Sequence, residues 1–461
     1  MNSSENTNIS RRELGKRVGT IAAVSALAGI AVPSVHAAEN STIQIALVGC
    51  GGRGTGAAID ALHAKGVHAK LVAMADAYKD RLDSSYKTLS GREDLADKVN
   101  VPAERRFIGF DAYKQAMDCL KPGDVVIFAT PLAFRWVHFT YAIEKGLNVF
   151  MEKPLSADGA ASRRMLKLAE EASAKNLKVG VGLMSRHARY LQELQKRISD
   201  GQIGDIILMR GYRMSGPIAS FRSTPKPAGM SDVEYQIRRF HSFLWASGGC
   251  YNDYFIHIID HLCWMKNAWP THAQGVGGRH YRFADDGTPF VDQNFDSYGI
   301  EYTFTDGTKL MFDGRCMDGT ATPYHSFIHG TKGCAIASKR NDCDGPSSIY
   351  KGTAPLPENR LWQSTDHSGP YQNEWNDLMY AIVNNKPYNE VKRGVEASVT
   401  GSMGRMAAHT GQIITFEQML NSTHEFAPGI DKLTNDSPGP LPSDAKGMYP
   451  VPEPGKKRTE Y

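Results

Sequence analysis

A stretch rich in histidine and aspartate, Asn252 to Trp264, carries the residue types of general acid–base chemistry. Four of its polar side chains would share one face of an α-helix, at positions i, i+4, i+7 and i+8: Asp253, His257, Asp260 and His261. Imidazole titrates near neutral pH, and a neighbouring carboxylate fixes its tautomer and orientation. The pattern therefore predicts a proton-transfer group, as an alcohol needs when it loses hydride. Two alternatives stay open, namely structural helix histidines and a zinc site on the i, i+4 pair. Since no H-E-x-x-H motif is present, we expect no metal.

A lysine in the triplet Glu152-Lys153-Pro154 is a second candidate for proton transfer. A lysine beside a reacting hydroxyl can donate a hydrogen bond to it, and its pKa falls readily when water is excluded. Pro154 would fix the local turn, with a cis peptide as one way of doing so. The triplet alone is a weak signal, so its meaning depends on the elements around it.

The elements that position these groups begin with a glycine-rich loop. A short apolar run at 43–48 predicts a buried strand, which leads into G-x-G-x-x-G at residues 49–54 and then a helix-forming segment. The glycines allow a tight turn, a close approach to a pyrophosphate and close helix packing, and the helix N-terminus favours negative charge. Asp76 ends the next apolar run, 22 residues after Gly54, where a carboxylate suits the ribose 2′-hydroxyl of NAD and repels a 2′-phosphate. NAD is therefore the predicted cofactor. NADP is an alternative, and so is an incidental glycine-rich turn.

Strand and helix patterns alternate from residue 43 to the Lys153 triplet. This order predicts right-handed crossovers and a doubly wound parallel sheet of the Rossmann type, with its ligand beyond the carboxyl ends of the strands. Glycine and polar residues that follow the predicted strand ends should line that crevice. The predicted cofactor-binding residues are Gly49, Gly51, Gly52, Arg53, Gly54, Asp76, Thr130, Pro131, His138, Glu152 and Lys153.

The second half of the chain is richer in strand patterns. The strand candidates are 205–212, 272–281, 297–304, 309–315 and 326–336. They predict an open, mainly antiparallel sheet, and hence an α/β protein of two domains. The predicted organisation is a Rossmann domain at 41–155, a substrate-binding and oligomerisation domain at 156–415, and an extended tail at 427–461.

The N-terminal residues predict export. Ser10-Arg11-Arg12-Glu13-Leu14-Gly15-Lys16 is similar to a twin-arginine signal, and an apolar stretch with a small-residue cleavage site follows. We therefore interpret residues 1–37 as a signal peptide, with a disordered N-terminal arm as the alternative. The predicted location is the periplasm, with a membrane tether if the leader is not cleaved. The twin-arginine export machinery carries folded proteins, which fits an enzyme that loads its cofactor before export.

The composition is that of an ordinary soluble protein, with 461 residues, of which 41% are hydrophobic and 22% charged. The net charge of +4 lies partly in the leader, so we expect neither nucleic acid nor an acidic membrane surface as a partner. The seven cysteines form no C-x-x-C pair and predict no disulfide framework. One bridge in an oxidising compartment stays open.

The ordered set of motifs resembles the glucose–fructose oxidoreductase, inositol dehydrogenase and rhizopine catabolism family, usually written Gfo/Idh/MocA. The resemblance covers about residues 43–415 and points to an exported twin-arginine subfamily. It implies a Rossmann domain followed by an open sheet that binds substrate and often joins subunits into homo-oligomers. It also implies that Lys153, Asp253 and His257 form the catalytic group, supported by Asp260.

The function predicted on these grounds is an NAD(P)-dependent oxidoreductase acting on a sugar, polyol or glycoside hydroxyl. Because free nicotinamide cofactor is scarce outside the cytoplasm, we expect the cofactor to be tightly bound and regenerated on the enzyme. One alternative is a redox-neutral glycoside hydrolase that oxidises, eliminates, hydrates and reduces its substrate. Another is a nucleotide-binding sensor without turnover. The supporting or substrate-binding candidates are Asp260, His261, Arg186, His187 and Tyr251.

Overall fold

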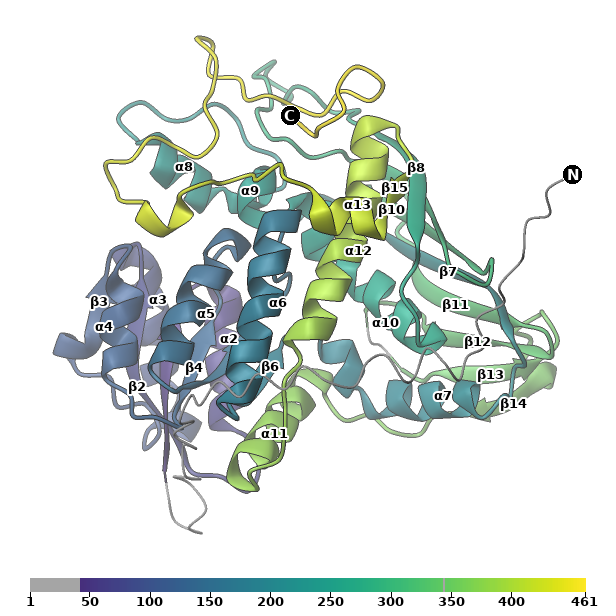
Figure 1. Cartoon of the computed structure of the whole chain (residues 1–461), viewed down its shortest axis with the longest axis horizontal. Coiled ribbons are helices and arrows are strands. Elements are labelled where there is room, and N and C mark those ends of the chain that lie inside the picture. The colour runs from purple at the N-terminus through teal and green to yellow at the C-terminus, as the bar shows by residue number, and fades with distance from the viewer. Residues whose placement is uncertain (1–41, 343–344) are drawn as a thin grey trace, which may run out of the picture. The chain divides into compact units, whose positions relative to one another are not determined.

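The computed structural model describes residues 42–342 and 345–461, and the predicted leader at 1–37 lies outside the described residues. The described chain forms two β-sheets, and helices pack on and between them (Figure 1). No helix within these residues is long and apolar enough to cross a membrane. The six described cysteines are free thiols, and Cys343 lies outside the described residues.

A six-stranded parallel sheet, in the order β3-β2-β1-β4-β5-β6, forms the N-terminal part. Its strands are β1 (Ile43–Val48), β2 (Ala69–Asp76), β3 (Arg106–Ile108), β4 (Val125–Phe128), β5 (Asn148–Met151) and β6 (Val179–Val181). Every residue of β4 and β5 is buried, because helices cover both faces of the sheet. The strand order reverses between β1 and β4, and this is where such a sheet binds its ligand. The predicted doubly wound Rossmann sheet is confirmed.

The connections between these strands contain helices that pack on the sheet. They are α2 (Gly52–Leu62), α3 (Lys79–Ser90), α4 (Ala112–Asp118), α5 (Arg135–Glu144) and α6 (Gly159–Ala174). Small side chains of α2, such as Ala57, Ala58 and Ala61, are fully buried and let that helix approach the strands closely. Figure 1 shows α5 and α6 side by side, in contact with each other.

The sixth strand lies beyond residue 155, where the sequence places the end of the Rossmann domain. After β5 the chain passes Lys153 and a cis Pro154, and α6 then carries it back to pair β6 with β5. The sheet therefore includes a crossover that the sequence assigns to the second domain. The change in sequence pattern near residue 156 suggests a domain boundary too early, because β6 has only three residues and is hard to recognise in the sequence.

A nine-stranded sheet forms the C-terminal part, in the order β14-β13-β12-β11-β7-β10-β9-β8-β15. Its strands are β7 (Ile206–Ser215), β8 (His272–Gly278), β9 (Ser297–Thr303), β10 (Lys309–Cys316), β11 (Tyr324–Gly330), β12 (Gly333–Ser338), β13 (Ser348–Lys351), β14 (Arg360–Gln363) and β15 (Ile414–Thr415). Only the β7–β10 pair is parallel. The predicted open, mainly antiparallel sheet is confirmed, and β9 and β10 alternate buried and partly exposed residues as half-buried strands do. The last three strands have two to four residues, too few to show a period in the sequence.

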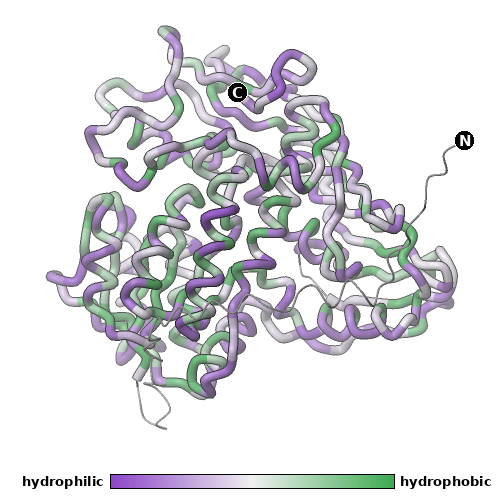
Figure 2. Tube along the Cα trace, in the orientation of Figure 1, coloured by the Kyte–Doolittle hydropathy of each residue, from purple (hydrophilic) through white to green (hydrophobic). Residues whose placement is uncertain are grey.

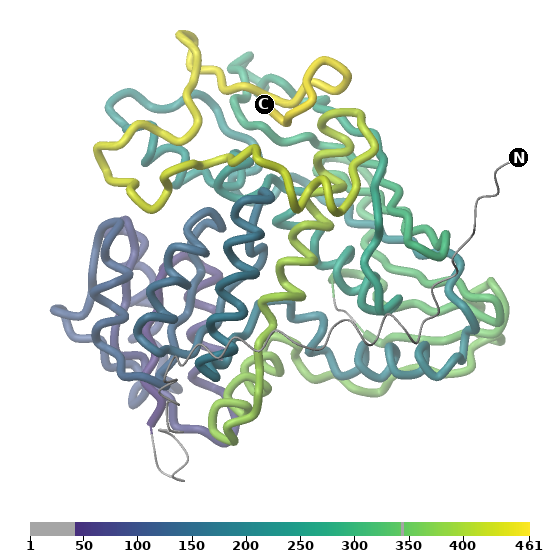
Figure 3. Tube along the Cα trace, viewed as in Figure 1, coloured from purple at the N-terminus to yellow at the C-terminus, as the bar shows by residue number. Residues whose placement is uncertain are grey.

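Helix α12 (Val391–Thr410) joins the two parts. It contacts α6 and β6 on the Rossmann side, and β8 and β9 on the side of the second sheet. Figure 3 shows this helix beside α6, although more than 200 residues separate them in the chain. Small residues make the close packing possible, since a Cβ at Gly404 would lie 2.1 Å from the Tyr302 hydroxyl. The remaining long helices are α7 (Arg189–Ser199), α10 (Ile256–Lys266) and α11 (Pro370–Val383).

The C-terminal residues 427–461 form an arm with little regular structure that covers α8 (Asp232–Arg238) and α9 (Leu244–Ser247). Figure 2 shows mostly hydrophilic colours along this arm. Several contacts anchor it; among them, the Gln236 amide donates to the Leu441 carbonyl at 2.7 Å, and Arg405 donates to the Glu460 carboxylate at 2.7 Å. The arm therefore helps to hold α8 in place.

Candidate functional site

The glycine-rich loop connects β1 to α2 and packs against the end of β4. Gly49 has φ of +97°, and a Cβ there would lie 2.6 Å from the carbonyl carbon of Ala129. A Cβ at Gly54 would lie 2.0 Å from the Gly49 carbonyl oxygen. At Gly51, in contrast, a Cβ would meet nothing within 4 Å. The loop therefore leaves open space at the N-terminus of α2, where unpaired N–H groups favour an anion.

Asp76 ends β2 and lies beside the loop. The Cys50 N–H donates to Oδ2 at 2.7 Å, and the Tyr78 N–H donates to Oδ1 at 2.9 Å. Burial raises the pKa of Asp76, and the two N–H donors oppose that shift. Each carboxylate oxygen keeps a lone pair that can accept a hydrogen bond from a ribose hydroxyl, as ribose recognition requires.

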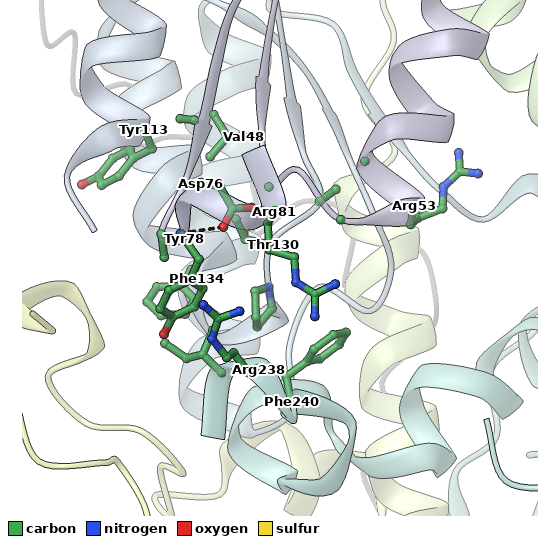
Figure 4. A pocket seen from close by; sticks show the side chains of 18 of the residues that line it. Val48, Arg53, Asp76, Tyr78, Arg81, Tyr113, Thr130, Phe134, Arg238 and Phe240 are labelled. Carbon is green, nitrogen blue, oxygen red and sulfur yellow. Dashed lines mark hydrogen bonds between the residues drawn. The ribbon is translucent and has the colours of Figure 1, made fainter. Parts of the chain in front are cut away.

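A cavity of about 540 Å³ opens at the carboxyl ends of β1, β2 and β4 (Figure 4). This volume is ordinary for a ligand pocket, roughly 300–1,000 Å³. Most of the predicted cofactor-binding residues line it: Gly49, Gly51, Gly52, Arg53, Gly54, Asp76, Thr130, Pro131 and His138. The other two, Glu152 and Lys153, are not among its lining residues.

His138 forms part of an aromatic side of the cavity. Its Nδ1 lies 3.4 Å from the Thr130 Oγ1, and its ring stacks on Phe134 with the centroids 5.9 Å apart. Burial, with Arg135 nearby, lowers the pKa of His138 to about 3, so the ring is neutral. Arg135 is itself buried and donates to the carbonyl oxygens of Phe128 and Thr130, which fixes the end of β4.

The opposite wall comes from residues 219–241 of the second part of the chain. Arg238 donates to both carboxylate oxygens of Asp80 at 2.9 Å, and its guanidinium lies 4.2 Å from the centroid of the Tyr78 ring. Figure 4 shows Arg238 and Phe240 on the side of the cavity opposite Val48. These contacts tie α8 to the β2–α3 connection. No motif in the sequence marks this wall.

A series of charged groups links this wall to the predicted catalytic residues. The Lys153 ammonium donates to Asp253 Oδ1 at 3.0 Å and to the Asp253 carbonyl oxygen at 2.5 Å. The other carboxylate oxygen, Oδ2, lies 3.5 Å from Nε2 of His241, whose Nδ1 lies 2.9 Å from Ser220 Oγ. Burial raises the pKa of Asp253, but Lys153 and then His241 outweigh it and lower the pKa below its usual value. Asp253 is therefore ionised, between a lysine and a histidine that lines the cavity.

His241 is the main residue of this site that the sequence does not predict. It lies in the run Arg238-Arg239-Phe240-His241, which matches no catalytic motif. It lies 12 residues before Asp253 in the sequence. This spacing does not predict a contact between the two residues, because a turn, a short helix and a loop lie between them.

The helix that carries Asp253 begins with a π-helical turn at Tyr251–Phe255, and α10 starts at Ile256. A π turn closes i→i+5 hydrogen bonds, so it shifts Asp253 away from the face that α-helical spacing assigns to it. His257 is buried, does not line the cavity, and has no partner for Nδ1 among the described residues. Burial, with Lys153 and Arg213 nearby, lowers the pKa of His257 well below 6.5. Lys153 and Arg213 are thus charged neighbours of both His257 and Asp253.

The other two members of that expected face have partners of their own. Arg186 holds Asp260 through two bonds, Nε to Oδ2 at 2.9 Å and Nη2 to Oδ1 at 2.8 Å. His261 Nε2 lies 2.9 Å from the Ser326 Oγ on β11. The described residues contain no group of three or more side chains that could ligate a metal.

Two further candidates lie in packed surroundings away from the cavity lining. His187 lies between Asp377 (2.7 Å) and Glu390 (3.2 Å); burial opposes protonation, but the two carboxylates outweigh it and raise its pKa. The Tyr251 hydroxyl is 2.9 Å from that of Tyr302. Their predicted roles in substrate binding stay predictions.

Arg53 lines the cavity, but its guanidinium turns toward acidic side chains. Its Nε donates to Glu152 Oε1 at 2.6 Å, and Nη2 lies 3.6 Å from Asp60 Oδ2. Figure 4 shows Arg53 apart from the other labelled side chains. Glu374 is buried with no hydrogen-bond partner for either oxygen among the described residues, and burial and Glu152 raise its pKa. The charge of Arg53 is thus balanced mainly by Glu152.

Residues 43–181 match the model of the Gfo/Idh/MocA oxidoreductase family, described as an NAD-binding Rossmann fold. The predicted resemblance is therefore confirmed for the N-terminal sheet. The chain is 30% identical over 214 residues to inositol 2-dehydrogenase 4 of Saccharopolyspora erythraea, an alignment that covers 46% of this chain and 55% of that protein. The chain spans about half the length of this relative, and about a third of an inositol 2-dehydrogenase of Corynebacterium glutamicum.

Solved structures share the fold over most of the chain. One is the aldose-aldose oxidoreductase of Caulobacter crescentus complexed with glycerol, with a TM-score of 0.62, 16% identity, and coverage of 81% of this chain and 100% of that one. Another is the scyllo-inositol dehydrogenase of Lactobacillus casei with bound NAD(H) and scyllo-inositol, with a TM-score of 0.58, 21% identity, and coverage of 82% and 100%. At such identities the likeness establishes the arrangement of the two sheets.

Proposed function

We propose that this chain, whose residues 43–181 match the NAD-binding model of the Gfo/Idh/MocA oxidoreductases, is an NAD-dependent dehydrogenase that oxidises a hydroxyl of a sugar or inositol-like polyol. One observation carries the proposal. The cavity built by the glycine loop and Asp76 is closed by a wall whose His241 contacts the Lys153–Asp253 pair. The similarity to inositol dehydrogenases supports the same class of substrate.

The residues of the cavity fit a dinucleotide. Gly51 and Gly52 leave open space where a side chain would meet no protein atom, which is the room that a pyrophosphate needs. Asp76 offers its carboxylate to a ribose hydroxyl, and Thr130, Pro131 and His138 line the cavity at the end of β4. When bound, NAD⁺ supplies the hydride acceptor.

Lys153 and Asp253 would act on the substrate oxygen. Both side chains are 15% exposed, so only a small part of each can reach a bound molecule. The ammonium of Lys153 can donate a hydrogen bond to the hydroxyl and to the carbonyl that it becomes. Asp253 orients that ammonium, because its carboxylate is ionised and accepts a hydrogen bond from it directly.

Tight cofactor binding is the finer part of the proposal. The wall from residues 219–241, held to the β2–α3 connection by the Arg238–Asp80 contact, would slow the release of a bound dinucleotide. Slow release fits an enzyme that is loaded before export and regenerates its cofactor in place. The twin-arginine signal at 1–37 and the periplasmic location are further parts of this proposal, and both rest on the sequence alone.

Homo-oligomer formation through the nine-stranded sheet is also proposed. Exposed apolar side chains on its strands, such as Ile207 and Val276, support it, because such side chains gain stability when a partner covers them. Sedimentation velocity of the purified chain tests this point, and a monomer at micromolar concentration would contradict it.

The main test is a purification of the whole chain, followed by release and identification of any bound nucleotide and a screen of inositols, aldoses and aryl glycosides. We expect NAD(H) to copurify, and the absorbance of NADH at 340 nm to rise with at least one polyol or sugar. Release of an aglycone without net NADH would instead establish the redox-neutral hydrolase. Bound nucleotide with no turnover of any of these substrates would establish the sensor.

A further inference from the structure

Two consecutive carbonyl oxygens of the π-helical turn accept hydrogen bonds from largely buried cations. The Lys153 ammonium donates to the Asp253 carbonyl oxygen at 2.5 Å, and Nη1 of Arg213 donates to the Tyr254 carbonyl oxygen. A π turn closes i→i+5 hydrogen bonds, so its carbonyl oxygens do not meet the partners that an α-helix would give them. Lys153 follows β5 of the first sheet and Arg213 belongs to β7 of the second. The turn that carries Asp253 is therefore held by one cation from each sheet.

Strand β7 presents Arg213 to the turn. Side chains alternate along a strand, so Gly211 and Arg213 share one face of β7. That face packs against the helix, because a Cβ at Gly211 would lie 2.5 Å from Cγ2 of Ile258 on α10. On the neighbouring strand β10, a Cβ at Gly314 would lie 2.4 Å from Cε2 of Phe255 in the π turn. The two glycines let the turn and α10 approach the sheet closely enough for an arginine on β7 to reach the backbone of the turn.

A carboxylate and two aromatic rings fix the guanidinium of Arg213. Its Nη1 donates to Asp342 Oδ1 at 3.1 Å, and the side chains of this pair are each 13% exposed. The centroids of the Tyr324 and Tyr254 rings lie 5.0 and 5.7 Å from the guanidinium carbon. Burial opposes the charge of Arg213, but Asp342 outweighs burial, and the pKa of Arg213 is raised above its usual value. Arg213 is therefore a charged donor held in one position beside the turn.

The charge of Arg213 also acts on the side chains of the predicted catalytic group. Burial raises the pKa of Asp253, but Lys153 and then His241 outweigh it. Arg213 adds to their effect. Burial, then Lys153 and then Arg213 lower the pKa of His257. Other charged or titratable groups near His257 are His261 and Arg53. Arg213 thus favours the ionised carboxylate and the neutral imidazole, the forms in which both groups can accept a proton.

We propose that Arg213, held by Asp342, is a positioning residue of the catalytic site, which fixes the π-helical turn so that Asp253 keeps its geometry relative to Lys153. This inference rests on the proposed dehydrogenase function and on the catalytic group predicted from the sequence. Arg213 acts through the backbone of the turn and not by touching the substrate. Without this charged donor, the Tyr254 carbonyl oxygen would lose its hydrogen bond, and the turn would relax toward the i→i+4 bonds of an α-helix. Such a change would displace the Asp253 side chain relative to the Lys153 ammonium.

Two variants of the whole chain test this assignment, Arg213→Gln and the double change Arg213→Gln/Asp342→Asn. The double change removes both charges of the pair and so avoids the unpaired carboxylate that Arg213→Gln leaves behind. We expect kcat to fall about 10–100-fold in both, as small displacements of catalytic groups cause, while KM changes less than about threefold. Asp342→Asn alone should lose less, since Arg213 can still donate to the turn. Arg210→Gln, at an exposed pair with Asp313 on the opposite face of β7, is the control that keeps kcat unchanged.

The pH profile separates a positioning role from general destabilisation. Because Arg213 lowers the pKa values of Asp253 and His257, its removal should raise both. The ascending limb of kcat/KM for oxidation should therefore move to higher pH in the double variant, whereas Arg210→Gln should leave that limb in place. A crystal structure of the double variant needs no turnover. It should show the Lys153 ammonium beyond hydrogen-bond distance of the Asp253 carbonyl oxygen.

Three results would overturn the proposal. The first is a double variant that keeps the kcat and the pH profile of the unaltered chain. The second is a crystal structure of that variant in which the π-helical turn and its contact with Lys153 are unchanged. The third is a rise in KM at constant kcat, because Arg213 would then bind the substrate instead of positioning the turn. An unaltered chain that oxidises no hydroxyl would refute the proposed function itself, and the crystal structure would still decide whether Arg213 shapes the turn.

Discussion

The two walls of the cavity are built in different ways. In the wall from the Rossmann sheet, the part near β1 and β2 consists mainly of backbone, namely a glycine loop, a helix N-terminus and a carboxylate held by N–H groups. Aromatic side chains such as Phe134 and His138 complete this wall. The wall from residues 219–241 consists of side chains held by other side chains, through the Arg238–Asp80, Ser220–His241 and His241–Asp253 contacts. The first wall is continuous with three neighbouring strands, whereas the second is held by contacts between distant segments.

This difference affects how each wall can change. A backbone wall has no room for a side chain at Gly49 or Gly54, but it needs only a few glycines and one acidic residue to form. A side-chain wall can exchange single residues, and each exchange can alter which substrate is bound. The comparison predicts that substitutions in the first wall affect nucleotide binding, whereas those in the second affect turnover.

The largest effect is expected from Lys153→Met, because Lys153 binds the Asp253 carboxylate that also lies near His241 of the second wall. Losing the ammonium removes the hydrogen bond to the reacting oxygen and leaves the buried Asp253 carboxylate without its closest cation. We expect kcat to fall by about 10²–10⁴-fold with NAD⁺ still bound. Steady-state kinetics and nucleotide analysis measure both, with the exposed Lys167→Met as the control. A kcat near that of the unaltered chain would contradict the proposed role of Lys153 in turnover.

Next in size is the anchor behind the second wall, Glu460. Burial opposes its ionisation, but Arg405 and then His409 outweigh burial and lower its pKa to about 2, against 4.5 for the free side chain. A depressed pKa adds stability above pH 4.5 that is lost as the pH falls toward 2. Glu460→Gln should lower the free energy of unfolding by about 3–5 kcal/mol at pH 7, because it leaves Arg405 buried without its charge partner.

Urea denaturation at pH 7 and at pH 3 measures the effect of Glu460→Gln. The difference between the two proteins should shrink at the lower pH. Glu453→Gln, at an exposed ion pair with lysines, should change little. If Glu460→Gln were as stable as the unaltered chain, the Arg405–Glu460 contact would not anchor the arm.

A pair of glycine substitutions tests the first wall directly. Gly54→Ala places a Cβ 2.0 Å from the Gly49 carbonyl oxygen, so we expect about 1–3 kcal/mol of destabilisation. Gly51→Ala meets no protein atom and should leave the melting temperature of the nucleotide-free chain unchanged. It should nonetheless weaken NAD⁺ binding at least about tenfold, or 1.4 kcal/mol, because it fills the space proposed for the pyrophosphate. Thermal melts with and without NAD⁺ read out both effects. A Gly51→Ala protein that NAD⁺ stabilises as much as it does the unaltered chain would contradict this reading.

Asp76→Asn should shift the choice of nucleotide. The carboxylate can accept a strong hydrogen bond from a ribose hydroxyl, and its charge repels a 2′-phosphate. We expect NAD⁺ affinity to fall about 10–100-fold while NADP⁺ affinity rises or stays constant. Calorimetry with both nucleotides measures the ratio, and Asp83→Asn, in an exposed pair with Lys79, is the control. An unchanged ratio would mean that Asp76 only fixes the loop.

The smallest effect is expected from Arg238→Ala, which opens the contact between the walls. Since Asp80 is largely exposed, this ion pair should contribute less than about 1 kcal/mol, so NAD⁺ release should speed up at most about fivefold. Stopped-flow fluorescence measures the rate, with Arg197→Ala at a surface pair as the control. A much larger increase would make this contact the main barrier to release.

Much of the first wall could be predicted from the sequence. The glycine spacing, the apolar strands and Asp76 are local patterns, and nine of the eleven predicted cofactor residues line the cavity. The orientation of the side chains on the helix of Asp253 is harder to predict, because a π-helical turn interrupts the α-helical periodicity on which the prediction of one shared face depends. His241 could not be predicted, because its importance comes from contacts with Asp253 and Ser220 that no spacing encodes.

The sequence by itself determined the Rossmann sheet, the mainly antiparallel second sheet and the backbone-built wall, because these follow from hydrophobic periodicity and from the conformational freedom of glycine. The tertiary structure alone decided that Asp260 pairs with Arg186, that His257 is buried, and that His241 reaches both the cavity and Asp253. These outcomes depend on how segments far apart in the chain pack together. That packing is a property of the whole core and not of any single stretch.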